Sequence, residues 1–387
     1  MTKITDIPAI RFKGFSDTWE QRKVGDVTKE LSEYDNLASG LPLLTSSRNG
    51  LMYQSDYRGN VTTENENTLF SVVPINACTY RHMSDDSTFH LNINTLEKGL
   101  VSREYPVFQE DGSNLKFIVQ YINSSNSFTK FCTKQKKGGT RTRLYYKTLC
   151  EYTLMITSIK EQNKIAEFFE SLDYLITLHQ RKYDKLTNVK KSMLEKMFPQ
   201  NGSNVPEIRF KGFTEAWEQR KVREVTDRYD NLRIPVAASL RVAGTTPYYG
   251  ANGIQDYVDG YTHDGEFILV AEDGANDLKN YPVKCVKGRI WVNNHAHVLQ
   301  GKYDCADNQF LAYAISQADI ESLLVGGGRA KLNAETLMGI DLLLPNKAEQ
   351  IRIGKYLAQL DNLITLHQRE LEKLKNLKKA CLEKMFV

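Results

Sequence analysis

The segment that decides the fold, residues 161–198, reads EQNKIAEFFESLDYLITLHQRKYDKLTNVKKSMLEKMF. It returns as EQIRIGKYLAQLDNLITLHQRELEKLKNLKKACLEKMF at residues 349–386, with 22 of 38 positions identical. In both copies apolar residues and one histidine recur three or four residues apart, in heptad a and d positions except at Lys182. The spacing predicts two long helices, each with one apolar seam and each about 57 Å long if unbroken.

Each predicted helix needs a partner for its seam, and its own copy is the obvious one. The connection between the copies is long enough for either orientation. We favour antiparallel pairing, because it makes the two halves equivalent around a pseudo-two-fold axis. This arrangement would bring His179 and His367 together near the helix midpoints. A register-setting role for them is favoured over a metal-binding or pH-sensing role.

A second, shorter repeat precedes each insert. Residues 10–28, IRFKGFSDTWEQRKVGDVT, return as IRFKGFTEAWEQRKVREVT at residues 208–226, with 14 of 19 positions identical. Trp19 and Trp217 recur in these two segments, so we predict that they are packing residues rather than stacking platforms. Residues 29–160 and 227–348 show almost no repeat by eye. The chain is therefore a duplicated frame that carries two different inserts.

The repeats predict the domain boundaries. Residues 1–160 form a first domain, 161–200 a first long spacer helix and linker, 201–348 a second domain, and 349–387 a second long spacer helix. The linker falls in PQNGSNVPE at residues 199–207, where Pro, Gly, Asn and Ser cluster.

Both inserts are predicted to be mixed α/β domains, so the fold class is α+β. In the second insert, turn signals such as Asn252-Gly253 alternate with short apolar runs, and a hairpin is predicted at Lys287-Gly288. In the first insert, residues 69–80 and 114–122 are predicted to be buried strands. Residues 307–316 predict a short helix that Asp307 caps.

Composition indicates a soluble globular protein. The chain has 387 residues, a net charge of +4, and six cysteines with no CxxC pair. We expect a cytoplasmic protein with reduced thiols, no zinc site, no signal peptide and no membrane span. Within the modest overall charge, residues 132–147, CTKQKKGGTRTRLYYK, hold six Lys or Arg and no acid. Local clustering of this kind indicates a polyanion surface.

Motifs for chemistry are missing. The chain has no GxxxxGK[ST] loop, no methyltransferase cofactor or Asn-Pro-Pro-aromatic motif, and no nuclease-like carboxylate cluster. His295 and His297 in NNHAH would share one face of a strand, but no third metal ligand is indicated nearby. We therefore predict a binding subunit with no catalytic residue, no metal and no cofactor.

The doubled helix motif LDxLITLHQRxxxKLxxLKKxxLEKMF resembles the specificity subunit of type I restriction–modification systems. The second insert, with YYGANGIQDYVDGY, EFILVAEDGA, WVNNHAHVL and GGGRAKLNAETLMGIDLLLP, is similar to a target recognition domain of that family. The first insert is a weaker match, through LLTSSRNG and GGTRTRLYYKTLCEYTLMI. The resemblance implies two target recognition domains separated by two long antiparallel coiled-coil helices, in a pseudo-two-fold internal repeat.

The resemblance also implies function and partners. Each recognition domain would read one half of a bipartite double-stranded DNA site, and the paired helices would set the unread gap. Two methyltransferase subunits, which carry S-adenosylmethionine, would dock on the helices, and restriction motor-nuclease subunits can join. Because the inserts differ, the two half-sites should differ.

Positively charged and amide side chains on loops are the groups that contact phosphates and base edges. The predicted DNA-binding residues of the first domain are Ser46, Ser47, Arg48, Lys136, Lys137, Arg141 and Arg143. Those of the second domain are Tyr248, Tyr249, Asn252, Arg329 and Lys331.

Two alternatives stay open. A non-enzymatic coiled-coil scaffold, whose two inserts bind protein partners, explains the duplication but not the acid-free basic stretch. A methyltransferase–recognition fusion is disfavoured by the missing motifs.

Overall fold

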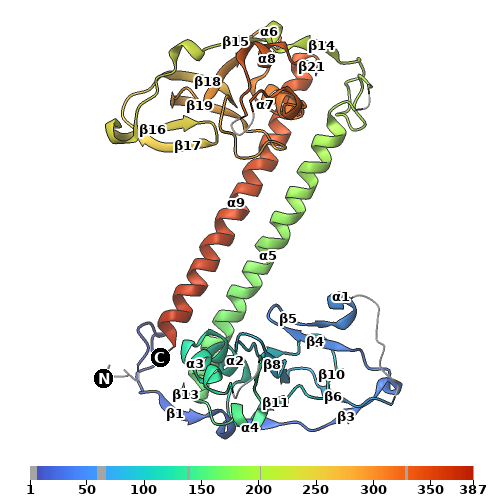
Figure 1. Cartoon of the computed structure of the whole chain (residues 1–387), viewed down its shortest axis with the longest axis vertical. Coiled ribbons are helices and arrows are strands. Elements are labelled where there is room, and N and C mark those ends of the chain that lie inside the picture. Colours follow the sequence, from blue (N-terminus) through green and yellow to red (C-terminus); the bar gives the residue numbers. More distant parts are fainter. Residues whose placement is uncertain (1–6, 59–66, 137–139, 201, 327–329, 387) are drawn as a thin grey trace. The chain divides into compact units, whose positions relative to one another are not determined.

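The computed structural model describes residues 7–58, 67–136, 140–200, 202–326 and 330–386. The chain divides into two compact units (Figure 1). The first consists of Met1–Leu178 with Glu370–Val387, and the second of His179–Arg369. Each unit therefore contains one insert together with segments of both long helices.

The first unit is built from small antiparallel sheets. The strand orders are β1-β13, β10-β6-β3, β2-β11-β7-β9, β12-β8 and β4-β5. The strands are β1 Glu20–Lys23, β2 Thr28–Glu30, β3 Tyr34–Asp35, β4 Leu44–Ser47, β5 Gly50–Tyr53, β6 Phe70–Val73, β7 Cys78–Thr79, β8 Met83–Ser84, β9 Asn92–Ile93, β10 Gly99–Ser102, β11 Val107–Glu110, β12 Thr142–Arg143 and β13 Thr153–Ile156. The helices are η1 Val24–Asp26, η2 Leu37–Ser39, α1 Gln54–Arg58, α2 Leu115–Ser124, α3 Asn126–Lys134 and α4 Tyr146–Leu149.

The second unit has a larger sheet. Six strands lie in the order β15-β20-β18-β19-β16-β17, and β14 pairs separately with β21. The strands are β14 Glu218–Lys221, β15 Thr226–Arg228, β16 Ala243–Gly250, β17 Gly253–Val258, β18 His263–Ala271, β19 Val283–Val292, β20 Ala296–Gly301 and β21 Asp341–Leu344. The helices are α6 Val222–Val225, η3 Asp230–Leu232, η4 Ala238–Leu240, α7 Asn308–Ser316, η5 Glu321–Leu323 and α8 Ala334–Gly339.

Residues 114–122, predicted to be a strand, form helix α2 instead. The Asn114 side chain caps the helix by accepting a hydrogen bond from the Phe117 amide at 3.0 Å. Leu115, Ile118 and Ile122 are buried, at the helical spacing of three and four residues. The prediction was wrong because a short apolar run does not distinguish a buried strand from a buried helix.

The predicted hairpin at Lys287-Gly288 is also wrong. Strand β19 continues through both residues, and Gly288 pairs with Gly265 of β18. Gly288 has a φ of +94°, which marks an irregular point within the ladder rather than a turn. The Asn252-Gly253 turn, by contrast, does join β16 to β17, and Asp307 caps α7 by accepting from the Phe310 amide at 2.8 Å.

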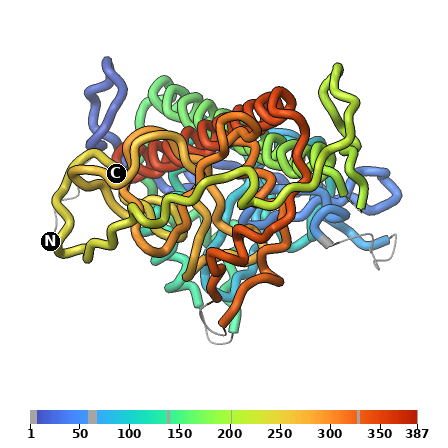
Figure 2. Tube along the Cα trace, turned by 90° about the horizontal axis from the view of Figure 1, so that it is seen from above, coloured from blue at the N-terminus to red at the C-terminus, as the bar shows by residue number. Residues whose placement is uncertain are grey.

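The two repeated segments form helices α5, Ile159–Met197, and α9, Lys347–Met385. Each begins two residues before the predicted boundary. Within each unit the helices lie side by side and run antiparallel (Figure 1 and Figure 2). In the first unit Lys378 contacts Asp173 at 2.6 Å. In the second unit Lys190 pairs with Asp361, and the Nδ1 atoms of His179 and His367 are 3.1 Å apart, as antiparallel pairing predicted.

The short repeats anchor each insert to a long helix. Arg11 donates two hydrogen bonds to Glu161 at 2.6 and 2.7 Å, and Arg209 does the same to Glu349. Both glutamate side chains are fully buried, and two hydrogen bonds from an arginine neutralise the charge of each carboxylate.

Each insert's core also takes in the C-terminal end of the other half's helix. Phe198, just after α5, lies 5.8 Å from Trp217 and 5.5 Å from Phe310 between ring centroids. In the first unit, Phe386 after α9 lies 6.4 Å from Trp19 and 5.6 Å from Phe117. Both tryptophans are buried, which confirms their predicted role in packing.

These contacts reveal a repeat that the sequence hides. Helix α2 of the first insert and α7 of the second occupy equivalent places, since both contact the repeated tryptophan and the phenylalanine at a helix end. The backbone amides of the two cap residues, Asn114 and Asp307, also donate to equivalent glutamines, Gln162 and Gln350. The two inserts therefore share a framework despite their dissimilar sequences.

Among the helices of the described ranges, none is long and apolar enough to cross a membrane.

Candidate nucleic-acid interface

Three distant segments of the first unit meet at one surface pocket of about 350 Å³. They are the β4 end with the turn after it, Tyr57 of α1, and the segment 81–90 around β8. Strand β12 pairs with β8 beside the pocket, through Thr142 and Ser84. The Asn92 amide donates to Ser46 Oγ at 2.7 Å and to the Ser47 carbonyl at 2.8 Å, which holds the β4 end against this surface. Two predicted residues far apart in the sequence, Arg48 and Arg141, reach adjacent aspartates at this surface.

The two arginines of this surface are paired with neighbouring acids. Arg48 pairs with Asp86, and Arg141 donates to Asp85 at 2.8 Å. Asp86 also accepts from Ser84 Oγ at 2.8 Å and from the Thr88 amide at 3.0 Å. Hydrogen bonds from Arg48, Ser84 and Thr88 hold the pKa of Asp86 well below its ordinary value. Both arginines and both aspartates are exposed, so all four can exchange partners with a ligand.

The other predicted residues of the first domain have different surroundings. Ser46 is buried and serves as an acceptor for Asn92 rather than as a surface contact. Lys136 and Arg143 are exposed. Lys137 lies outside the described residues.

In the second unit, two predicted tyrosines are buried. The Tyr248 side chain is 1% exposed, and its hydroxyl accepts from the Val236 amide at 2.9 Å. The Arg241 guanidinium covers its ring at 4.1 Å. Tyr249 lies in the hydrophobic core, where burial raises the pKa of its hydroxyl. Neither ring is exposed enough to stack on a base, so neither tyrosine is proposed to contact DNA.

Asn252 is exposed at the β16–β17 turn. Its side chain donates to the Gly274 carbonyl and accepts from the Asn276 amide, both at 2.9 Å. It therefore fixes the loop after β18 while remaining at the surface.

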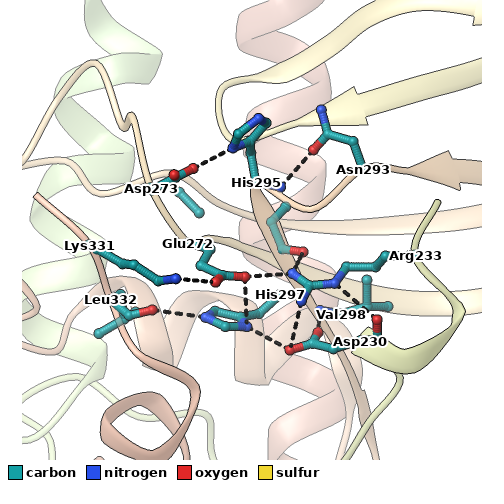
Figure 3. Close-up of polar contacts among 12 residues, drawn as sticks. Asp230, Arg233, Glu272, Asp273, Asn293, His295, His297, Val298, Lys331 and Leu332 are labelled. Atoms are coloured by element: carbon teal, nitrogen blue, oxygen red, sulfur yellow. Dashed lines mark hydrogen bonds and ion pairs between the residues drawn. The ribbon is translucent and has the colours of Figure 1, made fainter. Parts of the chain in front are cut away.

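Lys331 is exposed and belongs to a network of charged groups (Figure 3). Its ammonium contacts Glu272 at 2.9 Å, and Arg233 donates to the same carboxylate at 2.6 Å. The Leu332 amide donates to the Glu272 carbonyl at 2.7 Å, so backbone and side chain of Glu272 both hold this segment. Arg329 lies outside the described residues.

The buried His297 completes the network (Figure 3). Its Nδ1 lies 2.7 Å from an Asp230 carboxylate oxygen, and its Nε2 lies 2.9 Å from the Leu332 carbonyl. Because one imidazole contacts both, it ties the segment that carries Lys331 to the sheet. His295, in the turn before β20, pairs instead with Asp273, so the two histidines have separate partners.

The network lowers the pKa values of its two acids. Burial alone would raise the pKa of Glu272, but hydrogen bonds from Lys331 and Arg233 outweigh it and the net shift is downward. Burial likewise opposes ionisation of Asp230, and the hydrogen bonds from His297 and the Val298 amide reverse that effect on its pKa. Both carboxylates are therefore held ionised.

Sequence reasoning missed the residues that organise these surfaces. Asp85, Asp86 and Arg81 lie in RHMSDDSTFH, and Glu272 lies in AEDGAN. The signal available was a polar cluster between two apolar runs. Among the described residues, no group of three or more His, Cys, Asp or Glu is placed to hold a metal ion.

Comparison with known proteins identifies a matching family and several similar chains. The family model described as "Type I restriction modification DNA specificity domain" matches residues 87–188 and 214–376. The type I restriction enzyme specificity subunit S.HindORF215P of Haemophilus influenzae is 44% identical over 146 residues, which is 38% of either chain. The MjaVIII specificity subunit of Methanocaldococcus jannaschii is 24% identical over 286 residues, which is 64% of either chain. The chain thus matches less than two thirds of the length of these two relatives.

A solved structure shares the fold over nearly the full length. The type I restriction–modification system S subunit from M. genitalium superposes with a TM-score of 0.69 and 13% identity, covering 98% of this chain and 99% of that chain. At this identity the likeness is one of fold, and the family model supplies the relationship. The chain belongs to the family of type I restriction–modification specificity subunits.

Proposed function

We propose that this chain is the non-catalytic DNA-specificity subunit of a type I restriction–modification enzyme. Each insert serves as a target recognition domain for one half of a bipartite, asymmetric site in double-stranded DNA. Two methyltransferase subunits, which bind S-adenosylmethionine, dock on the long helices, and restriction subunits can join them.

The observation that carries DNA reading is the convergence in the first domain. Arg48 lines one polar pocket beside Ser47, and Arg141, far away in the sequence, pairs with Asp85 of the same pocket. Guanidinium groups and hydroxyls on loops are suited to phosphates and to base edges in the major groove. A protein-binding scaffold does not need such a concentration of polar donors.

Differences between the inserts support an asymmetric target. The first domain presents the β4–β5 turn with Arg48, whereas the second presents Asn252 at the β16–β17 turn and Lys331 in a segment bridged to Asp273. Two surfaces with different donors select different bases.

Exposed apolar residues on the helices support docking of two like subunits. Leu175 and Leu363 occupy equivalent repeat positions, and both belong to the apolar a and d pattern that predicted the seam. They are instead 38% and 43% exposed. Matching apolar positions on the two helices offer two equivalent contact sites, and exposed apolar residues are typical of interfaces.

Binding of the full chain to a random-sequence duplex at several salt concentrations tests the proposal. A DNA-reading chain loses affinity linearly in log salt, because each phosphate contact releases counterions. A flat salt dependence would favour the protein-binding scaffold. Binding of S-adenosylmethionine by the isolated chain, measured by calorimetry, would instead favour a methyltransferase fusion.

The target itself is found by methylome sequencing of a host that expresses the chain with its methyltransferase. We expect one asymmetric, interrupted motif methylated on adenine. A palindromic or continuous motif would contradict the assignment of one half-site to each domain.

A further inference from the structure

At and beside the pocket of the first domain lie two acids, Asp85 and Asp86, where a simple DNA-binding surface would have none. Asp85 and Asp86 are adjacent in the sequence, yet they neutralise two arginines from different segments, Arg141 and Arg48. A carboxylate beside a phosphate-binding cation opposes DNA, so two of them on one face need a physical explanation.

The loop that carries these acids is held in place. Ser84 Oγ and the Thr88 amide both donate to Asp86. Ser87 has a φ of +62°, unusual for a residue other than glycine, and its hydroxyl is buried 2.6 Å from that of Thr142. Strand β12, which follows Arg141, is paired with β8, which precedes Asp85. The loop is thus held in place, and Arg48 and Arg141 reach its two carboxylates.

We propose that Asp85 and Asp86 are specificity-determining residues that hold Arg48 and Arg141 away from DNA phosphates. The inference rests on the proposed DNA-reading function. On a random duplex an arginine can exchange its carboxylate for a phosphate, which gains little because one anion replaces another. At the correct half-site a base edge can accept from the arginine, and the freed carboxylate can accept from the amino group of cytosine. The acids therefore suppress non-specific binding more than specific binding.

The second domain shows a comparable pairing of Lys331 with Glu272 (Figure 3). There the carboxylate also holds the largely buried Arg233, so removing it would disturb the domain. The exposed pairs of the first domain are the better place for a test.

The decisive experiment compares full-length D85N/D86N with wild type and with E33Q/E170Q. The control removes two acids from exposed pairs in the same unit, Glu33–Lys98 and Glu170–Lys116, and so matches the change in net charge. Affinity for a random duplex is measured between 50 and 300 mM salt. We expect D85N/D86N to bind about tenfold more tightly at low salt, with a log–log slope steeper by about 1.8, because two more phosphates are contacted.

The control should change the slope by less than about 0.5, because its freed lysines lie away from the pocket. Equal slopes for D85N/D86N and E33Q/E170Q would overturn the inference. Adding R48A and R141A to D85N/D86N should remove the gain, and persistence of the gain would also overturn it. If D85N/D86N does not fold, D85N alone should steepen the slope by about 0.9. A flat salt dependence for the wild type would instead reject the proposed function itself.

Discussion

Cations predicted to reach DNA are held by carboxylates in both domains, but the surroundings of the pairs differ. Arg48 and Arg141 form exposed pairs with Asp86 and Asp85. Such pairs contribute about 0–1 kcal/mol each, so they are easily exchanged. Lys331 pairs with Glu272, which is largely buried with Arg233. At this second site the ion pair contributes to stability and holds the segment that carries Lys331.

Replacing Glu272 by Gln should destabilise the second unit by about 2 kcal/mol at pH 7, because Arg233 loses its anionic partner in a largely buried site. The pKa of Glu272 is lowered from its ordinary 4.5. Its contribution is therefore present above pH 4.5 and is lost as the pH falls through the lower folded-state pKa. In urea unfolding between pH 7 and pH 3, the free energy of unfolding should fall less for E272Q than for wild type as the pH is lowered.

The matched control is E335Q, which removes an exposed acid paired with Arg223. We expect it to change the free energy of unfolding by less than about 0.5 kcal/mol. An equal loss in E272Q and E335Q, or an unchanged acid dependence in E272Q, would contradict the structural role of the network.

At the scale of elements, the ends of the long helices complete the cores of the inserts. Phe198 follows α5 and packs on α7 through Phe310, while Phe386 follows α9 and packs on α2 through Phe117. The backbone repeats the arrangement, since the Ile208 amide donates to Lys196 and the Ile10 amide to Lys384, both at 2.9 Å. Each insert therefore depends on a helix that begins in the other half of the sequence.

Replacing Phe198 by Ala should leave a cavity and cost the second unit about 3 kcal/mol. Hydrogen exchange followed by mass spectrometry should then show faster exchange in peptides from α7. Peptides from α2 should be unchanged, because they belong to a different compact unit.

Two variants serve as controls for F198A. F386A should produce the reciprocal pattern, with faster exchange in α2 and unchanged exchange in α7. L366A, at an exposed position of α9, should leave both helices protected. Faster exchange in both α2 and α7 for either phenylalanine variant would contradict independent completion of the two cores.

At the scale of the whole molecule, α5 and α9 each continue without a break from one unit into the other. Neither helix has a proline in its interior, and Pro199 follows the end of α5. The two compact units are thus joined by two continuous helices.

Inserting one heptad into both helices, at the level where His179 meets His367, should change the unread gap of the target. Seven residues add about 10 Å of helix, or at most about three base pairs of duplex. Each half-site should stay the same, because no recognition surface is altered. Methylome sequencing checks both points, and an altered half-site with an unchanged gap would contradict the assignment. A heptad of exposed residues replaced without a change in length is the control.

The sequence predicted what depends on local periodicity and on repetition. The doubled a and d pattern predicted α5 and α9, and the pseudo-two-fold equivalence of the two halves favoured their antiparallel pairing. The repeated Trp19 and Trp217 predicted packing positions. It did not predict α2, because a run of nine residues has too few turns to separate strand from helix periodicity. The equivalence of α2 and α7 was hidden as well, since a core accepts many apolar sequences of similar volume.

The candidate site was decided by tertiary structure. Composition indicated the basic stretch around Arg141, and the resemblance indicated Arg48 and Lys331. Only the pairing of β12 with β8 brings Arg141 beside the loop of Asp85 and Asp86, and only His297 ties the Lys331 segment to Asp230. Ion pairs between distant residues depend on where the backbone places each charge, and no local pattern records that. Periodicity therefore determined the frame of this protein, while long-range contacts determined which charges face one another.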